Sequence, residues 1–145
     1  MLYFDTVPDI RALVDPLLGQ SYEAWDTVME PELQGPHRPE ACWLLVRHLF
    51  LAGFGLDLAR DPAQASQAFT EVWFRDSSHG QAFPALQPWD AYILAARRGV
   101  ADHLGLVVDG TYFVHIRKRT GICLESLTRW QPRVLQVARL HQLMA

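Results

Sequence analysis

Residues 40–54 constrain the fold of this chain most, because they predict a helix that is apolar on nearly every side. The segment is rich in leucine, Pro39 suits the first turn, and Gly53 and Gly55 suit the exit. A helix without a wide polar face is stable only where neighbours cover it on several sides. We therefore expect a central buried helix, with Arg47 and His48 pointing outward or forming pairs.

The composition fits one globular domain over residues 1–145. Half of the residues are hydrophobic, and a chain of this length can bury a sizeable core. The net charge is -3, and no stripe of basic residues occurs along the sequence. These features exclude a nucleic-acid partner, which requires a concentration of positive charge.

The N-terminal segment predicts neither secretion nor membrane insertion. Residues 1–15 lack a positive region and contain Asp5, Pro8 and Asp9, so we expect no signal peptide. The most apolar run, residues 41–58, is interrupted by charged side chains and is too short to cross a bilayer.

The remaining periodicity predicts an α+β fold, with N-terminal helices packed on a C-terminal antiparallel sheet. Further helices are expected at residues 9–18, 21–29 and 61–74, the last capped by Asp61, with loops at 31–39 and 75–87. From Trp89 onward the apolar period changes toward two, which indicates strands at 91–94, 103–108, 111–117, 121–124 and 134–140. Cys123 is expected to be a buried residue of one of these strands.

Asp109 and Gly110 predict a hairpin that decides the relation between His103 and His115. A two-residue turn would place the two imidazoles on opposite faces of the sheet. A three-residue turn centred on Asp109 would place His103 directly opposite His115 on one face. We predict the second form, with that face covered by the start of the central helix.

Cys42 is the candidate nucleophile. It lies near the start of the helix at 40–54, where free backbone N–H groups and the helix dipole favour a thiolate and can hold an oxyanion. His103 is the expected general base and acid, and His115 is expected to orient its ring. The alternatives are an inert buried cysteine with ordinary strand histidines, or a zinc site, which lacks an evident fourth ligand. We expect no metal and no cofactor.

This order of residues resembles the NlpC family of papain-like cysteine peptidases, from Pro39 to Leu140. The segment 41–46, Ala-Cys-Trp-Leu-Leu-Val, is similar to the family's cysteine motif, although Ala41 and Leu44 replace its usual aspartate and glycine. The segment 103–106, His-Leu-Gly-Leu, is similar to its histidine motif, and a second histidine follows after twelve positions. Residues 31–40 contain no counterpart of the tyrosine that many relatives carry.

The resemblance implies a papain-like fold and a catalytic triad of Cys42, His103 and His115. Trp89 and Asp90 look like the family's Gly-Asp turn. We expect these two residues and Trp43 to contact substrate, with packing in the core or at the rim as the alternative.

The resemblance further implies hydrolysis of peptidoglycan stem peptides at γ-D-glutamyl bonds through a thioester. The run at 42–50 resembles the subgroup found in bacteriophage tails, which implies a tail-tip enzyme with hub proteins as partners and release by lysis. The alternatives are an inactive structural tail-tip or assembly component, and a toxin-like peptidase delivered between bacteria.

Overall fold

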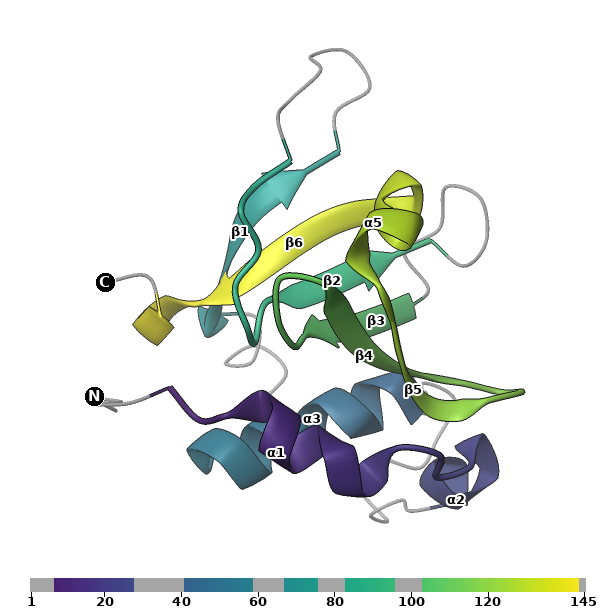
Figure 1. Ribbon diagram of the computed structural model, residues 1–145. Coiled ribbons are helices and arrows are strands. Elements are labelled where there is room, and N and C mark those ends of the chain that lie inside the picture. Colours follow the sequence, from purple (N-terminus) through teal and green to yellow (C-terminus); the bar gives the residue numbers. More distant parts are fainter. Residues whose placement is uncertain (1–6, 28–40, 59–66, 76–82, 96–102, 144–145) are drawn as a thin grey trace.

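Helix α3 (Ala41–Phe54) lies against one face of a six-stranded antiparallel sheet (Figure 1). The computed structural model describes residues 7–27, 41–58, 67–75, 83–95 and 103–143. The expected central helix is confirmed, because eight of its residues are buried on several sides of the helix. Its polar side chains lie where the sequence predicts, since Arg47 pairs with Asp57 at 2.9 Å and His48 is exposed.

Two short helices precede α3, close to their predicted places. Helix α1 (Ile10–Val14) begins after Asp9, whose carboxylate accepts a hydrogen bond from the Arg11 N–H at 3.0 Å. The chain continues as the 3₁₀ helix η1 (Asp15–Leu17), because Pro16 has no N–H to continue the α-helical pattern. Helix α2 (Tyr22–Thr27) follows, and both α1 and α2 pack against α3. The predicted loop at 31–39 lies outside the described residues.

The sheet confirms the predicted C-terminal strands. Its strands run in the order β1-β6-β2-β3-β4-β5, so the last strand in the chain inserts beside the first two. Their bounds are β1 (Phe69–Phe74), β2 (Ala91–Leu94), β3 (His103–Val107), β4 (Tyr112–Arg117), β5 (Gly121–Ser126) and β6 (Val134–Leu140). Between β5 and β6 lie α5 (Leu127–Trp130) and the 3₁₀ helix η3 (Gln131–Arg133), and η4 (His141–Leu143) follows β6.

Strand β1 corrects the helix predicted over residues 61–74. Residues 69–74 pair antiparallel with β6, from Phe69 opposite Leu140 to Phe74 opposite Gln136. Pairing with a strand 60 residues later in the chain satisfies the backbone and overrides local helical spacing. The ring of Phe69 also contacts Phe50 of α3, at a centroid distance of 5.4 Å. Residues 61–66 of the predicted helix lie outside the described part of the chain.

The sheet separates two apolar clusters. The cluster on the helical side joins α1 and α3 to one face of β3 and β4, and its residues from these strands include Leu106, Val114 and Ile116. The cluster on the opposite face lies beneath α5 and contains Tyr92, Val107, Phe113, Leu127, Trp130, Val134 and Val137. Among the described residues, no helix has both the length and the apolar character needed to span a membrane.

Candidate active site

Cys42 is the second residue of α3, and its side chain is 8% exposed. The first turn of a helix leaves backbone N–H groups free of intrahelical partners, so the sulfur lies beside positive partial charge. The sulfur also belongs to the apolar cluster between α3 and the sheet. In Figure 1, α3 begins toward the side of the molecule at which β3 begins.

His103 and His115 lie on one face of the sheet, as predicted. The Nε2 atom of His103 is 2.7 Å from the Nδ1 atom of His115, and the two ring planes meet edge to face. His103 is the first residue of β3, and His115 is the fourth of β4. This contact excludes the two-residue turn, which would have separated the rings.

The predicted register of the hairpin is wrong by two residues. Leu106 pairs with Val114, and the N–H of Val108 donates to the oxygen of Tyr112, so the turn spans residues 109–111 rather than 108–110. The turn starts at Asp109, because its carboxylate accepts hydrogen bonds from the N–H groups of residues 111 and 112. Continuing this register places Gly105, not His103, opposite His115. The two rings therefore meet diagonally across the strands.

The body of the central helix does not cover the histidine face. It packs on the opposite face, against Leu106 and Val114, whereas its first turn, which carries Cys42, lies toward the end of the sheet where β3 begins (Figure 1). The ring of His115 instead contacts Phe113 and Trp130, at centroid distances of 4.7 and 5.4 Å. The physical reason is the alternation of the strands, which gives the larger apolar face to the helices.

His115 is a neutral imidazole at physiological pH. Its side chain is fully buried, and burial lowers its pKa from 6.5 to about 4, with the neighbouring His103 adding to the effect. A buried neutral ring can accept a hydrogen bond at one nitrogen and donate at the other. His115 can thus orient His103 without carrying a charge of its own.

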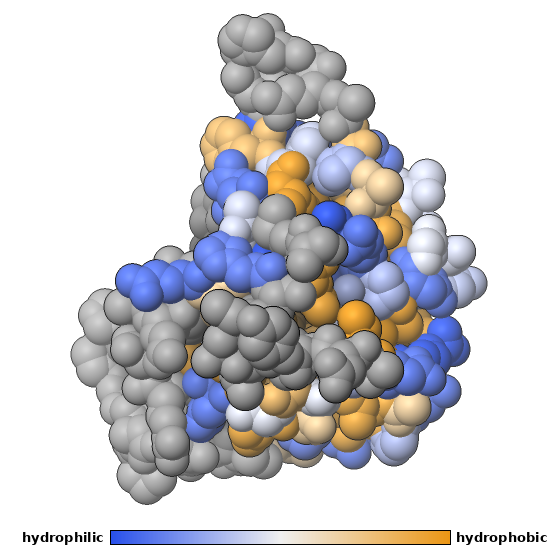
Figure 2. All heavy atoms as spheres, turned by 90° about the vertical axis from the view of Figure 1, so that its left-hand side faces the viewer, coloured by the Kyte–Doolittle hydropathy of each residue, from blue (hydrophilic) through white to orange (hydrophobic). Residues whose placement is uncertain are grey.

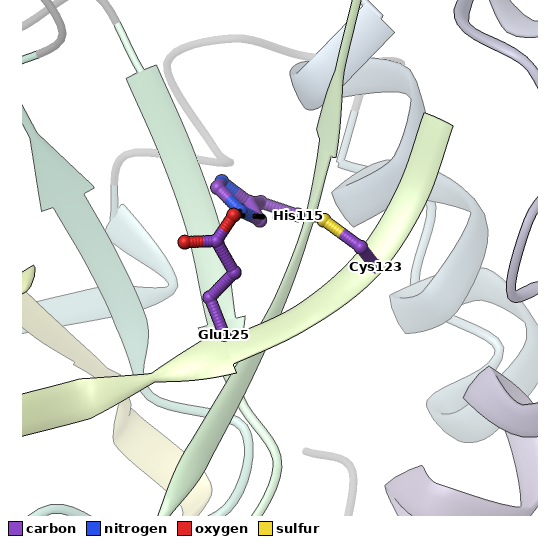
Figure 3. A group of neighbouring side chains, drawn as sticks. All are labelled: His115, Cys123 and Glu125. Atoms are coloured by element: carbon purple, nitrogen blue, oxygen red, sulfur yellow. Dashed lines mark hydrogen bonds and ion pairs between the residues drawn. The ribbon is translucent and has the colours of Figure 1, made fainter. Parts of the chain in front are cut away.

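Glu125 on β5 is the neighbour of His115 that the sequence analysis missed. Its Oε1 atom is 3.3 Å from Nε2 of His115, although Nε2 has no well-aligned hydrogen bond from the described residues. Figure 3 shows the carboxylate turned toward the imidazole. Arg117 also contacts Oε1, at 3.1 Å, and the indole N–H of Trp130 donates to Oε2.

The pKa of Glu125 lies below its usual value. Burial alone would raise it, but hydrogen bonds from Trp130 and Arg117 and the nearby His115 ring outweigh that effect. The carboxylate is therefore ionised and acts only as an acceptor. The sequence contains a signal for this residue. The turn after Arg117 pairs β4 with β5, and the alternation of side chains along β5 then places Glu125 on the same face as His115.

Three potential metal donors lie together at this point of the sheet. The nitrogen of His115, the sulfur of Cys123 and an oxygen of Glu125 lie within 4.8 Å of one another (Figure 3). Two features of the cluster oppose a cation: Arg117 already contacts the same carboxylate, and burial raises the pKa of the Cys123 thiol, which disfavours the metal-binding thiolate. Cys123 is half-buried, not fully buried as the sequence suggested.

Trp89 and Asp90 are fully buried, which assigns both to the core rather than to a surface that a substrate can reach. The indole of Trp89 donates to the oxygen of Pro8 at 2.8 Å, and its ring packs against Phe54. Asp90 accepts two hydrogen bonds from the guanidinium of Arg139, each at 2.8 Å.

Trp43 is half-buried against the helical-side cluster. It is the one predicted substrate contact with exposed surface, and its role stays a prediction.

Comparison with known proteins supports the fold. The chain resembles the NlpC/p60 domain of the peptidoglycan hydrolase SagA, with a TM-score of 0.56, 15% identity, and coverage of 91% of this chain and 97% of that domain. It also resembles a Staphylococcus aureus subsp. aureus Mu50 protein, described as similar to lipoprotein and of the NLP/P60 family, with a TM-score of 0.54 and 18% identity. That match covers 96% of this chain but 43% of the staphylococcal one.

No family model and no curated protein matches the sequence. The expected papain-like α+β architecture is confirmed by the shared arrangement of helices and sheet. This chain therefore has the fold of an NlpC/P60 domain.

Proposed function

We propose that this protein is a cysteine peptidase that cleaves stem peptides of peptidoglycan. The observation that carries the proposal is the 2.7 Å contact between His103 and His115 on the fold of NlpC/P60 domains, one of which belongs to a peptidoglycan hydrolase. A buried neutral histidine that orients a second, less buried histidine is the arrangement that a general base requires. Cys42 supplies the nucleophile at the start of α3.

In the proposed reaction, His103 takes the proton of Cys42, and the thiolate attacks the carbonyl carbon of the peptide bond. The N–H groups at the start of α3 stabilise the oxyanion of the tetrahedral intermediate. The intermediate collapses to a thioester as His103 gives its proton to the leaving amine. A water molecule, deprotonated by His103, then hydrolyses the thioester and releases a carboxylic acid and the Cys42 thiol.

Glu125 completes this arrangement as a positioning residue. A carboxylate at Nε2 of His115 favours the tautomer that carries its proton there, which leaves Nδ1 free to accept from Nε2 of His103. The other nitrogen of His103 then has the lone pair needed for Cys42. In this arrangement Nε2 of His103 donates to Nδ1 of His115, and the Glu125 carboxylate faces the proton at Nε2 of His115.

Digestion of muropeptides by the purified protein tests the proposal. We expect Cys42→Ala and His103→Ala to abolish cleavage, because each removes a group that forms or breaks bonds. His48→Ala is the matched control, because it removes an exposed imidazole of α3 outside the reaction, and it should retain activity. Equal cleavage by Cys42→Ala and the unmodified protein would refute the mechanism.

The assignment to a phage-like tail tip is part of the proposal and is supported by the sequence resemblance around Cys42. Co-purification with a tail hub protein from assembled particles tests it. The alternative is a structural component that keeps the fold without activity, and the low exposure of Cys42 favours it. A folded protein that carries the hub interaction but releases no peptide product would establish that alternative.

A further inference from the structure

A pocket beside the histidine pair is lined mainly by arginines. It has a volume of about 210 Å³, and its walls are Arg117, Glu125, Arg129, Trp130 and Arg133. Three cations surround it with one carboxylate, in a chain whose net charge is -3. Positive charge is thus concentrated in this pocket against the trend of the whole molecule.

Trp130 holds two of these arginines in place. The guanidinium carbons of Arg117 and Arg133 lie 5.5 and 5.3 Å from the centroid of its ring. Contact with an aromatic face restrains a guanidinium without using its N–H donors. The donors of a stacked arginine stay available to an anion, and less entropy is lost when that anion binds.

Glu125 offsets only one of the three positive charges of the pocket. Its carboxylate is already engaged by Arg117, Trp130 and His115. Among the described residues, the guanidinium groups of Arg129 and Arg133 have no hydrogen-bond acceptor. Two arginines therefore present free donors to the same pocket.

We propose that this pocket binds a carboxylate group of the peptide substrate. The inference rests on the proposed function and names a substrate group for the same site. Planar guanidinium groups pair with carboxylates through two parallel hydrogen bonds, and such charge-assisted bonds are stronger than neutral ones. A peptide linked through the side chain of glutamate keeps its α-carboxylate free, so the substrate class carries a suitable anion.

The position of the pocket agrees with this role. Two successive ring contacts, of 4.9 and 5.4 Å, connect His103 to His115 and His115 to Trp130. Glu125 forms part of the pocket wall and also contacts His115. An anion bound by Arg129 and Arg133 would therefore lie beside the histidine pair.

The test measures binding to the full chain carrying Cys42→Ala, which prevents turnover. The probes are γ-D-glutamyl-L-lysine with both carboxylates free and the same dipeptide with both as carboxamides. We expect the acid to bind about tenfold more tightly, and the preference to weaken with added salt. The paired change Arg129→Gln and Arg133→Gln should remove the preference.

Arg11→Gln is the matched control. It removes one positive charge from an exposed pair with Asp15 on α1, so it should keep both the fold and the preference for the acid. Equal binding of the acid and the amide, or a preference that survives the paired change, would overturn the proposal. Inorganic phosphate provides a third probe, and tight phosphate binding without discrimination between the dipeptides would reassign the pocket to phosphate groups.

The outcome is separable from that of the proposed function. If the unmodified protein cleaves no muropeptide but the Cys42→Ala protein still prefers the acid, the pocket stands and the peptidase proposal falls. If the protein cleaves acid and amide substrates with equal kcat/KM, the peptidase proposal stands and the pocket assignment falls.

Discussion

His115 shows how burial determines the chemistry of a single residue. The same side chain at an exposed position would gain and lose its proton near neutral pH. Here burial lowers the pKa of the imidazole to about 4, so the ring stays neutral at any pH above that value. The residue can then transmit orientation to His103 in the pH range in which an imidazole base works.

The low pKa of His115 predicts that the protein becomes less stable as the pH falls. The unfolded chain takes up this proton near pH 6.5 and the folded chain only near pH 4, so between these values the unfolded state binds more protons. The contribution to the free energy of unfolding is full above pH 6.5 and falls by roughly 3 kcal/mol as the pH decreases to 4.

Urea unfolding between pH 4 and 8 measures this effect. His115→Gln should flatten the dependence, whereas His48→Gln, at an exposed position of α3, should leave it intact. A pH dependence unchanged by His115→Gln would contradict the assignment.

Glu125→Gln tests the positioning role of the carboxylate. An amide favours the required tautomer of His115 less strongly, so we expect kcat to fall on the order of tenfold with little change in KM. Nitrogen NMR shifts of His115 should show loss of the proton at Nε2 in the variant. Glu71→Gln, an exposed change on β1, is the control. If Glu125→Gln changes neither the tautomer of His115 nor kcat, Glu125 has no positioning role.

At the scale of elements, Gly105 determines how closely β3 and β4 approach. A methyl group there would lie 2.7 Å from the ring of Phe113 and 2.8 Å from the backbone oxygen of Val114. Because a backbone atom cannot move aside without moving its strand, the position requires glycine. The same glycine lies between the diagonal histidines, so strand separation would also change their contact.

Gly105→Ala should lower the free energy of unfolding by about 1–3 kcal/mol, as overpacking does in other cores. It should also reduce peptidase activity, because His103 would shift away from His115. Gly110→Ala in the same hairpin is the control, since no atom lies within 4 Å of the added methyl group. Equal effects of the two substitutions on chemical unfolding would be inconsistent with this packing constraint.

At the scale of the whole molecule, the ion pair of Asp90 and Arg139 ties the C-terminal strand to the start of β2. Asp90 is fully buried, and the Arg139 side chain is 14% exposed. These residues are 49 positions apart in the chain, and β6 lies between β1 and β2. The pair therefore connects strands at the centre of the sheet. On the molecular surface seen in Figure 2, hydrophilic and hydrophobic side chains are interspersed.

Arg139→Met should destabilise the protein by about 3–5 kcal/mol, because it leaves a buried carboxylate without its partner. Adding Asp90→Asn should recover part of the loss, since the uncompensated charge disappears. Arg11→Met removes an exposed ion pair and should cost far less. Chemical unfolding of the four proteins measures the difference, and similar losses for Arg11→Met and Arg139→Met would contradict the role of burial.

The sequence by itself determined the elements whose signals are local. The apolar run around α3, the helical spacing after Asp9 and the alternation of β2 to β6 each predict their own conformation, because neighbours along the chain impose the period. The spacing of His103 and His115 allowed either a shared face or opposite faces, and the prediction of a shared face depended on choosing the three-residue turn. A period of two fixes the face of a strand residue but not its exact partner.

Only the tertiary structure decided the features that depend on distant segments. Residues 69–74 form a strand because they pair with β6. The hairpin register differs by two residues from the predicted one because the turn begins at Asp109. Glu125 reached His115 through the pairing of β5 with β4, and Trp89 and Asp90 became core residues through partners far along the chain. In each case the deciding energy comes from contacts that form only when the chain is folded, so residue order alone could not specify them.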